Sequence, residues 1–249
     1  MGVMRLGFVI GMVCITVLFS CSPAGELTRE ENAPEPAYFY TIDGSVESDE
    51  QLERYLGPWR RRVDLEMNRT LSVSAGPFRY GQPESALGNV TADILRYRAA
   101  HEMERFVHLA ILDPALIAAE LPKGEITVGD LHKLMPADER LTVLEMEGRT
   151  VRDLADEIAA EGGAPISGLR MVIQNSSASG VLVDSGSLED DRTYFLATGH
   201  STLSEDRFPS LQEYRSRTDY DLLLRELMID YFRANPCVEP LEDHRVRIR

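Results

Sequence analysis

Histidines are the side chains that could hold a catalytic metal ion, and no two of them stand in a ligand-like setting. They are His101, His108, His132, His200 and His244. A two-metal hydrolytic site needs several histidines and carboxylates that converge on ions about 4 Å apart. His101-Glu102 is followed by His108, which would fall on a different helix face from the second histidine of a zinc-binding His-Glu-x-x-His helix. We therefore expect no metal site in this chain.

Nucleophilic chemistry has equally little support in the spacing of residues. The chain shows no Ser-His-Asp order and no Cys-His pair. Cys237 lies between Pro236 and Val238 with only His244 nearby, a setting typical of a free structural cysteine. Three cysteines in all give neither a disulfide framework nor a structural zinc site. We expect the chain not to act as a hydrolase by itself.

The N-terminal segment has the pattern of an export signal. Arg5 precedes an apolar run from Leu6 to Phe19, which is shorter than the roughly 20 residues of a membrane span. The run ends in Leu18-Phe19-Ser20-Cys21, which is similar to a bacterial lipobox, where the cysteine becomes the lipidated first residue. The alternative is an ordinary cleaved signal with a chance cysteine. We expect a lipoprotein signal peptide over residues 1–20 and a lipid anchor on Cys21, at the periplasmic or outer-membrane face of the bacterial envelope.

Composition divides the remainder into a tether and one domain. Residues 21–37 are rich in Pro, Glu, Ser and Ala and cannot bury enough apolar surface to fold, so we expect a flexible tether. Residues 38–249 suffice for one domain with a real core. The net charge of −15 argues against a nucleic-acid polymer as partner, because phosphate binding needs a basic patch. It leaves open a mononucleotide in a local pocket.

Strand and helix patterns alternate along the domain, which indicates a mixed α/β or α+β class. Thr150 is expected to be an N-cap, with Asp153 three residues on, and Asp219 and Asp221 to open the last helix. The expected helices cover residues 49–68, 84–100, 129–134, from 150 to the Gly162-Gly163 stop, and 219–234. The expected strands cover residues 70–74, 107–112, 141–146, 169–173, 181–183 and 194–197.

Six segments, in this order, resemble the C-terminal domain of the 5′-nucleotidase family. They are ESALGNVTADILR (84–96), GEITVGDLHKLMP (124–136), LTVLEMEGRTVRDLADE (141–157), ISGLRMVI (166–173), DDRTYFLATG (190–199) and LRELMIDYFRANPCVEPLEDHRVRI (224–248). The resemblance implies a fold of layered sheets covered by helices. It also implies that a second, metallophosphatase domain with two divalent ions does the family's chemistry, and the resemblance does not extend to that domain. Divalent metals are therefore expected in a partner rather than in this chain.

The resemblance implies a substrate pocket that is altered here. The family segment ahead of Gly-x-Ile-Thr carries Asn, glycines and a substrate-binding Arg, whereas this chain reads LDPALIAAELP over residues 112–122. Asp113 stands where the Asn would be, and Ala118 where the Arg would be. Losing that Arg removes a bidentate anion contact, and Asp113 would repel a phosphate.

The family also holds the base between two aromatic rings. The first ring's place falls at or near Leu141, where core packing is the better interpretation. In the second loop Phe208 keeps the aromatic, and the alternative is that Phe208 only packs the loop. Arg207 is a possible replacement cation for phosphate or for stacking. The candidate substrate residues are thus Phe208, Arg207, Asp113 and Leu141.

Short polar residues retained from the family motifs are expected to serve the fold more than a ligand, because such residues cap helices and form turns. They are Gly88-Asn89, Asp93, Thr127 and Gly129-Asp130.

Three functional hypotheses remain. The first is a split enzyme, in which a separately encoded metallophosphatase chain docks here for nucleotide hydrolysis. It predicts an exposed apolar patch. The second is a surface module that binds a nucleoside or nucleotide sugar without catalysis. The third is a degenerate structural or interaction lipoprotein with no small ligand.

Overall fold

The structure is a computed structural model that describes residues 47–204 and 206–249. The predicted signal peptide, the predicted tether and the predicted lipidation site Cys21 lie outside these residues. A compact unit runs from Glu50 to Arg249. Within the described part of the chain, every helix falls short of the length and apolar character that a bilayer span requires.

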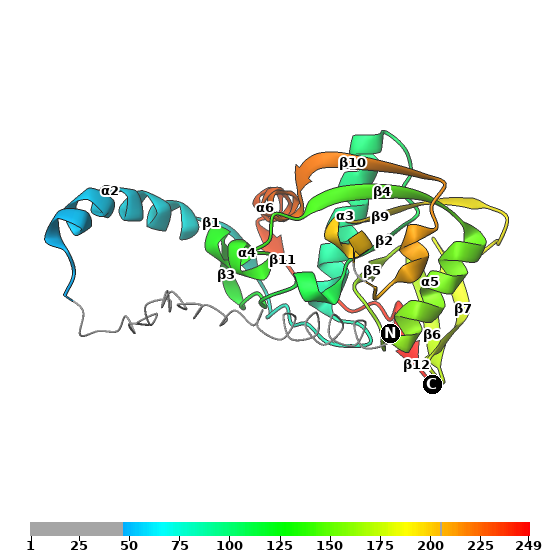
Figure 1. The fold of residues 1–249 in the computed structure, drawn as a ribbon. Coiled ribbons are helices and arrows are strands. Elements are labelled where there is room, and N and C mark those ends of the chain that lie inside the picture. Colours follow the sequence, from blue (N-terminus) through cyan, green and yellow to red (C-terminus); the bar gives the residue numbers. More distant parts are fainter. Residues whose placement is uncertain (1–46, 205) are drawn as a thin grey trace, which may run out of the picture. The chain divides into compact units, whose positions relative to one another are not determined.

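A five-stranded sheet with the order β10-β4-β9-β2-β5 forms the middle layer of the unit (Figure 1). Its strands are β10 (Ser216–Leu223), β4 (Arg140–Glu147), β9 (Thr193–Gly199), β2 (Leu109–Ile111) and β5 (Ile166–Ser167). Strands β2 and β9 run parallel, and the other neighbours run antiparallel. The sheet therefore joins segments that are far apart in sequence. As a result, loops that follow different strands lie near one another.

Two smaller sheets accompany it. One has the order β11-β1-β3 and is made of β11 (Cys237–Val238), β1 (Thr70–Ser74) and β3 (Gly124–Thr127). The other has the order β12-β6-β7-β8 and is made of β12 (Val246–Ile248), β6 (Leu169–Gln174), β7 (Ser177–Val183) and β8 (Gly186–Ser187). Each of these sheets includes a strand from the C-terminal segment, so this segment links the two smaller sheets.

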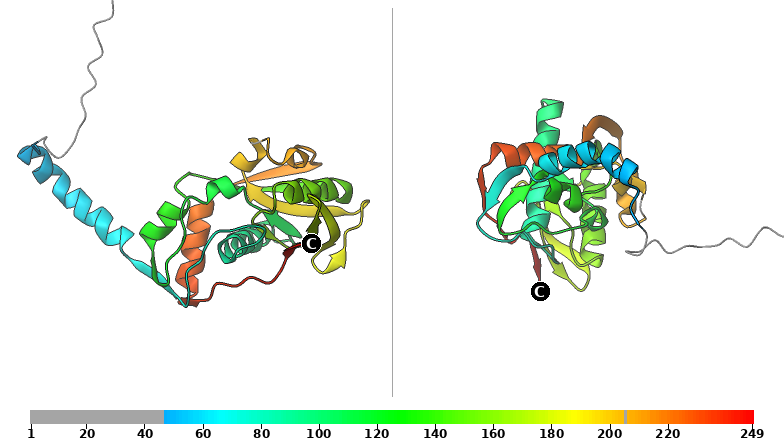
Figure 2. Two further views of the ribbon diagram at one scale, coloured as in Figure 1. Left: turned by 90° about the horizontal axis from the view of Figure 1, so that it is seen from below. Right: turned by 90° about the vertical axis from the view of Figure 1, so that its left-hand side faces the viewer.

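Helices cover these sheets, except the first helix, which extends away from them (Figures 1 and 2). The α-helices are α2 (Glu50–Met67), α3 (Ala86–Met103), α4 (Val128–Leu134), α5 (Gly148–Ala160) and α6 (Leu224–Ala234). Short 3₁₀ turns are η1 (Pro114–Leu116), η2 (Ser201–Ser204) and η3 (Pro209–Gln212). The architecture confirms the mixed α/β class of layered sheets covered by helices.

The five-stranded sheet separates two apolar cores, because side chains alternate between its faces. On β4, Leu141 and Val143 join the core under α3, α4 and α6, whereas Leu144 and Met146 join the core under α5. The second core also receives the inner face of β6 and β7. Both cores are thus specified by the period-two pattern that the sequence shows in residues 141–146.

Two predicted features are wrong, and the first is the start of the last helix. Residues 219–223 belong to strand β10, which pairs with β4 through contacts such as Asp219 opposite Thr142. Helix α6 begins only at Leu224. The acidic residues that suggest a first helical turn instead lie on an edge strand, where Asp219 accepts a hydrogen bond from Thr142 at 2.7 Å.

The second error concerns Thr150, which is not an N-cap. Helix α5 starts at Gly148, and Glu147 caps it without a side-chain hydrogen bond. The loop before β9 replaces the cap: the Gly148 and Arg149 amides donate to the carbonyls of Arg192 and Asp190. Gly148 is needed for this contact, since a Cβ there would lie 1.9 Å from the carbonyl oxygen of Glu189.

Candidate functional site

The structure brings together Asp113, which is buried, and Arg207, which is partly exposed. Asp113 follows β2 and caps η1, where its carboxylate accepts a hydrogen bond from the Ala115 amide at 2.7 Å. The Arg207 Nε lies 3.5 Å from the Asp113 carboxylate, and its Nη1 lies 2.7 Å from Glu161 at the end of α5. The altered loop and the possible replacement cation therefore form one ion-pair group.

Tyr80 joins this group and was not identified from the sequence. Its hydroxyl is buried and has no hydrogen-bond partner among the described residues. Burial raises the pKa of the Tyr80 hydroxyl, the positive charge of Arg207 partly opposes this, and Asp113 adds to it. We call Tyr80, Asp113, Glu161 and Arg207 the Arg207 cluster. Tyr80 comes from the segment before α3, which carries no motif and meets the other loops only in the folded chain.

Leu141 and Phe208 are not brought together. Leu141 lies on β4 opposite Gly199 and belongs to the core under α3, α4 and α6. Phe208 belongs to the core under α5, and both side chains are almost completely buried. As the domain stands, neither presents a surface on which a base could stack.

The Arg207 cluster can offer a guanidinium edge to an anion. The Asp113 side chain is 3% exposed and is held by its capping bond, whereas Glu161 is 40% exposed. Ion pairs with exposed carboxylates contribute little to stability, so Glu161 is the easier partner to displace. The Tyr80 hydroxyl is itself buried, so the exposed edge of the cluster belongs to Arg207 and Glu161. Among the described residues, no group of three His, Cys, Asp or Glu side chains could hold a metal ion.

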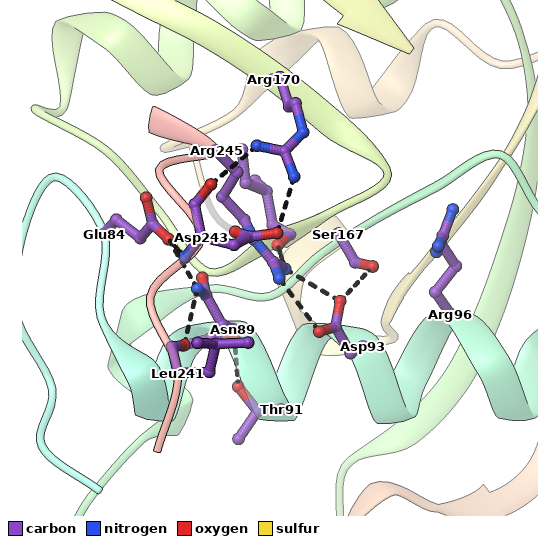
Figure 3. Close-up of polar contacts among 12 residues, drawn as sticks. Glu84, Asn89, Thr91, Asp93, Arg96, Ser167, Arg170, Leu241, Asp243 and Arg245 are labelled. Carbon is purple, nitrogen blue, oxygen red and sulfur yellow. Dashed lines mark hydrogen bonds and ion pairs between the residues drawn. The ribbon is translucent and has the colours of Figure 1, made fainter. Parts of the chain in front are cut away.

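The retained family residues on α3 hold the fold together (Figure 3). Asn89 donates hydrogen bonds to Glu84 at 2.7 Å and to the carbonyl of Leu241 at 3.2 Å. Asp93 accepts from Ser167 at 2.5 Å and from the Arg245 guanidinium at 2.9 and 3.1 Å. These bonds fasten α3 to the C-terminal segment and to β5.

Thr127 and Asp130 also have structural roles. The Thr127 hydroxyl accepts from the Asp130 amide, and the Asp130 carboxylate accepts from the Thr127 amide at 3.0 Å. This reciprocal capping box starts α4. Burial raises the pKa of Asp130, but its hydrogen bonds with Thr127 and its contact with Lys133 together outweigh this and lower the pKa overall.

Two cavities flank the outer face of α3. One has a volume of about 660 Å³ and lies toward β6, and the other has a volume of about 750 Å³ and lies toward α6. Asp93, Tyr97 and Arg245 line both. The ion pair between Asp93 and Arg245 therefore stands between the two cavities. No sequence pattern marks them, because the C-terminal segment that helps to form them is distant in the chain.

The fold is that of the C-terminal domains of nucleotidases of known structure. The 5′-nucleotidase precursor from Thermus thermophilus superposes with a TM-score of 0.68 at 21% identity, over 79% of this chain and 42% of that chain. The NAD nucleotidase of Haemophilus influenzae gives a TM-score of 0.61 at 16% identity, over 82% of this chain and 42% of that one.

Comparison of sequences leads to the same result. A family profile described as "5′-nucleotidase, C-terminal domain" matches residues 70–213, more than half of the chain. The chain therefore belongs to the 5′-nucleotidase C-terminal domain family. A protein of Vibrio vulnificus named 5′-nucleotidase is 20% identical over 205 residues, which is 80% of this chain. The chain spans only 37% of the length of that relative.

Proposed function

We propose that this chain is the substrate-side, non-metal half of a split phosphohydrolase that acts on nucleotides. A separately encoded metallophosphatase chain supplies the other half. The observation that carries the proposal is the partly exposed guanidinium of Arg207, which lies in the loop that the family resemblance assigns to the substrate. Its side chain is 37% exposed and is held on one edge by Asp113.

The Arg207 cluster supports phosphate or ribose recognition rather than chemistry. A phosphate oxygen that replaces Glu161 keeps Arg207 in a charge-assisted pair, so the exchange costs little. Asp113 limits the affinity, because its carboxylate repels a phosphate at the same guanidinium. Weak binding by the domain alone suits a half-site that a partner completes.

The proposal assigns the metal chemistry to the partner. Hydrolysis of phosphate esters by the two-metal mechanism needs clustered histidines and carboxylates. The described residues hold no such group, and the matched region is a C-terminal domain. In the proposed enzyme the divalent ions therefore belong to the metallophosphatase chain.

The test is a mild-detergent pull-down of the chain from its own membranes, followed by an assay of phosphate release from 5′-nucleotides. The expected result is a second chain in the eluate, release that a metal chelator abolishes, and no release by the recombinant domain alone. Arg207→Gln should raise KM about five-fold, as expected for one partly exposed charge pair. Arg215→Gln is the matched control, since Arg215 pairs with Glu147 elsewhere on the surface.

A second candidate is a degenerate structural or interaction lipoprotein, which the burial of Leu141 and Phe208 favours. An eluate that releases no phosphate and contains no second chain would favour this candidate over the split enzyme. A nucleoside or nucleotide-sugar binding module is distinguished by direct titration of the purified domain, which then binds without any partner.

We further propose that the chain is exported and lipid-anchored to the bacterial envelope through Cys21. The lipobox-like end of the apolar run supports this. Growth with labelled palmitate should label the wild-type chain and the Cys237→Ser variant, and the Cys21→Ser variant should lose the label. Equal labelling of the two variants would refute acylation at Cys21.

A further inference from the structure

Helix α2 is largely exposed. None of its 18 residues is buried, and its C-terminal end near Met67 meets Gly129 of α4. Gly57 and Pro58 lie within it, and both weaken a helix that lacks packing. Helices draw most of their stability from the burial of an amphipathic face. A surface that covers α2 would therefore stabilise it substantially.

An apolar stripe runs along α2. Tyr55, Trp59 and Val63 are four residues apart, so they share one side of the helix. Their exposed fractions are 70%, 58% and 54%. Tyrosine and tryptophan combine an apolar ring with a polar group, and they gather where a membrane meets water.

The middle of α2 is basic: residues 54–63 contain four arginines and no acidic residue, although the whole chain has a net charge of −15. Glu53 and Asp64 adjoin this run, and Arg60 pairs with Glu53. Both side chains of that pair are exposed, so a lipid phosphate can replace the carboxylate at little cost. Successive helical residues are about 100° apart, which places Arg60 and Arg62 on either flank of the stripe and Arg54 and Arg61 on the far side. Acidic groups beyond about 10 Å are largely screened in salt, so the charges of α2 itself act on what approaches the stripe, and its flanks are basic.

We propose that α2 is an interfacial helix that lies on an anionic lipid bilayer. Tyr55, Trp59 and Val63 enter the headgroup region, and Arg60 and Arg62 contact the lipid phosphates. An aromatic stripe with flanking basic residues is the composition that binds such surfaces. The inference does not rest on the split-enzyme proposal. Because α2 begins at Glu50, on the N-terminal side of the domain that also carries Cys21, an acyl anchor and this helix would together hold the domain at one membrane.

Trp59 makes the proposal directly measurable, because it is the only tryptophan of the chain. The protein is the chain from residue 21 on with Cys21→Ser, which keeps the whole compact unit and carries no acyl group. Its folding is checked by thermal unfolding. Vesicles of phosphatidylglycerol should shift Trp59 emission to the blue, and brominated lipids should quench it. Vesicles of phosphatidylcholine should do so much more weakly.

Two double variants with the same net charge distinguish a helix that binds the bilayer in one orientation from unoriented charge attraction. Each arginine at the surface strengthens binding about five-fold, so Arg60→Gln with Arg62→Gln should weaken vesicle binding about 25-fold. Arg54→Gln with Arg61→Gln, on the far side of the helix, should weaken it less than about three-fold.

Three results would overturn the proposal. The first is Trp59 emission that phosphatidylglycerol vesicles leave unchanged. The second is an equal loss in the two double variants, which would mean unoriented charge attraction. The third is a blue shift caused by the co-purifying metallophosphatase chain but not by vesicles, which would make α2 a protein-docking helix.

Discussion

Replacing Arg245 by methionine removes the side chain that ties the C-terminal segment to α3. The guanidinium donates to both carboxylate oxygens of Asp93, to Asp243 at 2.8 Å and to the carbonyl of Ile166 at 2.7 Å. Burial alone lowers the pKa of Arg245, but its hydrogen bonds to Asp93 and Asp243 outweigh this and raise the pKa. The charged form is therefore the one that the fold stabilises.

The expected loss of unfolding free energy follows from how deeply each residue of the Asp93–Arg245 ion pair is buried. Arg245 is 10% exposed, and breaking a buried ion pair costs about 3–5 kcal/mol. Asp93 is 49% exposed, so water can solvate it once the pair is broken, and we take the lower end, about 3 kcal/mol. For a domain of this size that corresponds to a fall in Tm of roughly 6–12 °C.

Thermal and urea unfolding followed by circular dichroism measure this loss. Arg247→Met is the matched control, because Arg247 lies two residues further on and is exposed. It should change the free energy of unfolding by less than about 0.5 kcal/mol. If Arg245→Met stays within about 1 kcal/mol of the wild type, the structural role assigned to Asp93 is wrong.

Three further outcomes are expected. Gly148→Ala should destabilise the domain by about 3 kcal/mol, because its Cβ would overlap a backbone carbonyl, whereas Gly186→Ala has a nearest neighbour at 3.6 Å and should be tolerated in the same urea titration. Burial lowers the pKa of His108 in the folded chain. As the pH falls, this histidine is therefore protonated at a higher pH in the unfolded chain than in the folded one. The free energy of unfolding should therefore fall as pH drops below about 6.5, and His108→Gln should remove that part of the fall. Asp113→Asn keeps a capping oxygen but removes the negative charge beside Arg207, so the affinity for 5′-AMP measured by calorimetry should rise about five-fold. An unchanged affinity would mean that the Asp113–Arg207 pair does not contact the ligand.

Periodicity in the sequence predicted the elements in which buried side chains recur at the spacing of a strand or a helix. Residues 141–146 alternate and form β4, and residues 84–100 carry a helical stripe and form most of α3. Prediction failed where a distant partner decides the conformation. Residues 219–223 have the acidic start of a helix, yet pairing with β4 makes them a strand.

The candidate site was predictable only in part. The family resemblance identified Asp113 and Arg207, which the fold does bring within 3.5 Å. It could not indicate Tyr80 or Glu161, since their proximity arises from four separate chain segments. Nor could it show that Leu141 and Phe208 lie in different cores, because which face of a strand or loop is buried depends on the layers around it.

The most direct test of the proposed split enzyme is reconstitution with whichever metallophosphatase chain the pull-down recovers. Phosphate release from 5′-AMP would be measured for each chain alone and for the two together, with and without a chelator. The account predicts that the recombinant domain is inactive and that adding it raises kcat/KM of the partner at least ten-fold, with all activity lost to the chelator. Equal rates with and without this chain, or an eluate that contains no second chain, would contradict it.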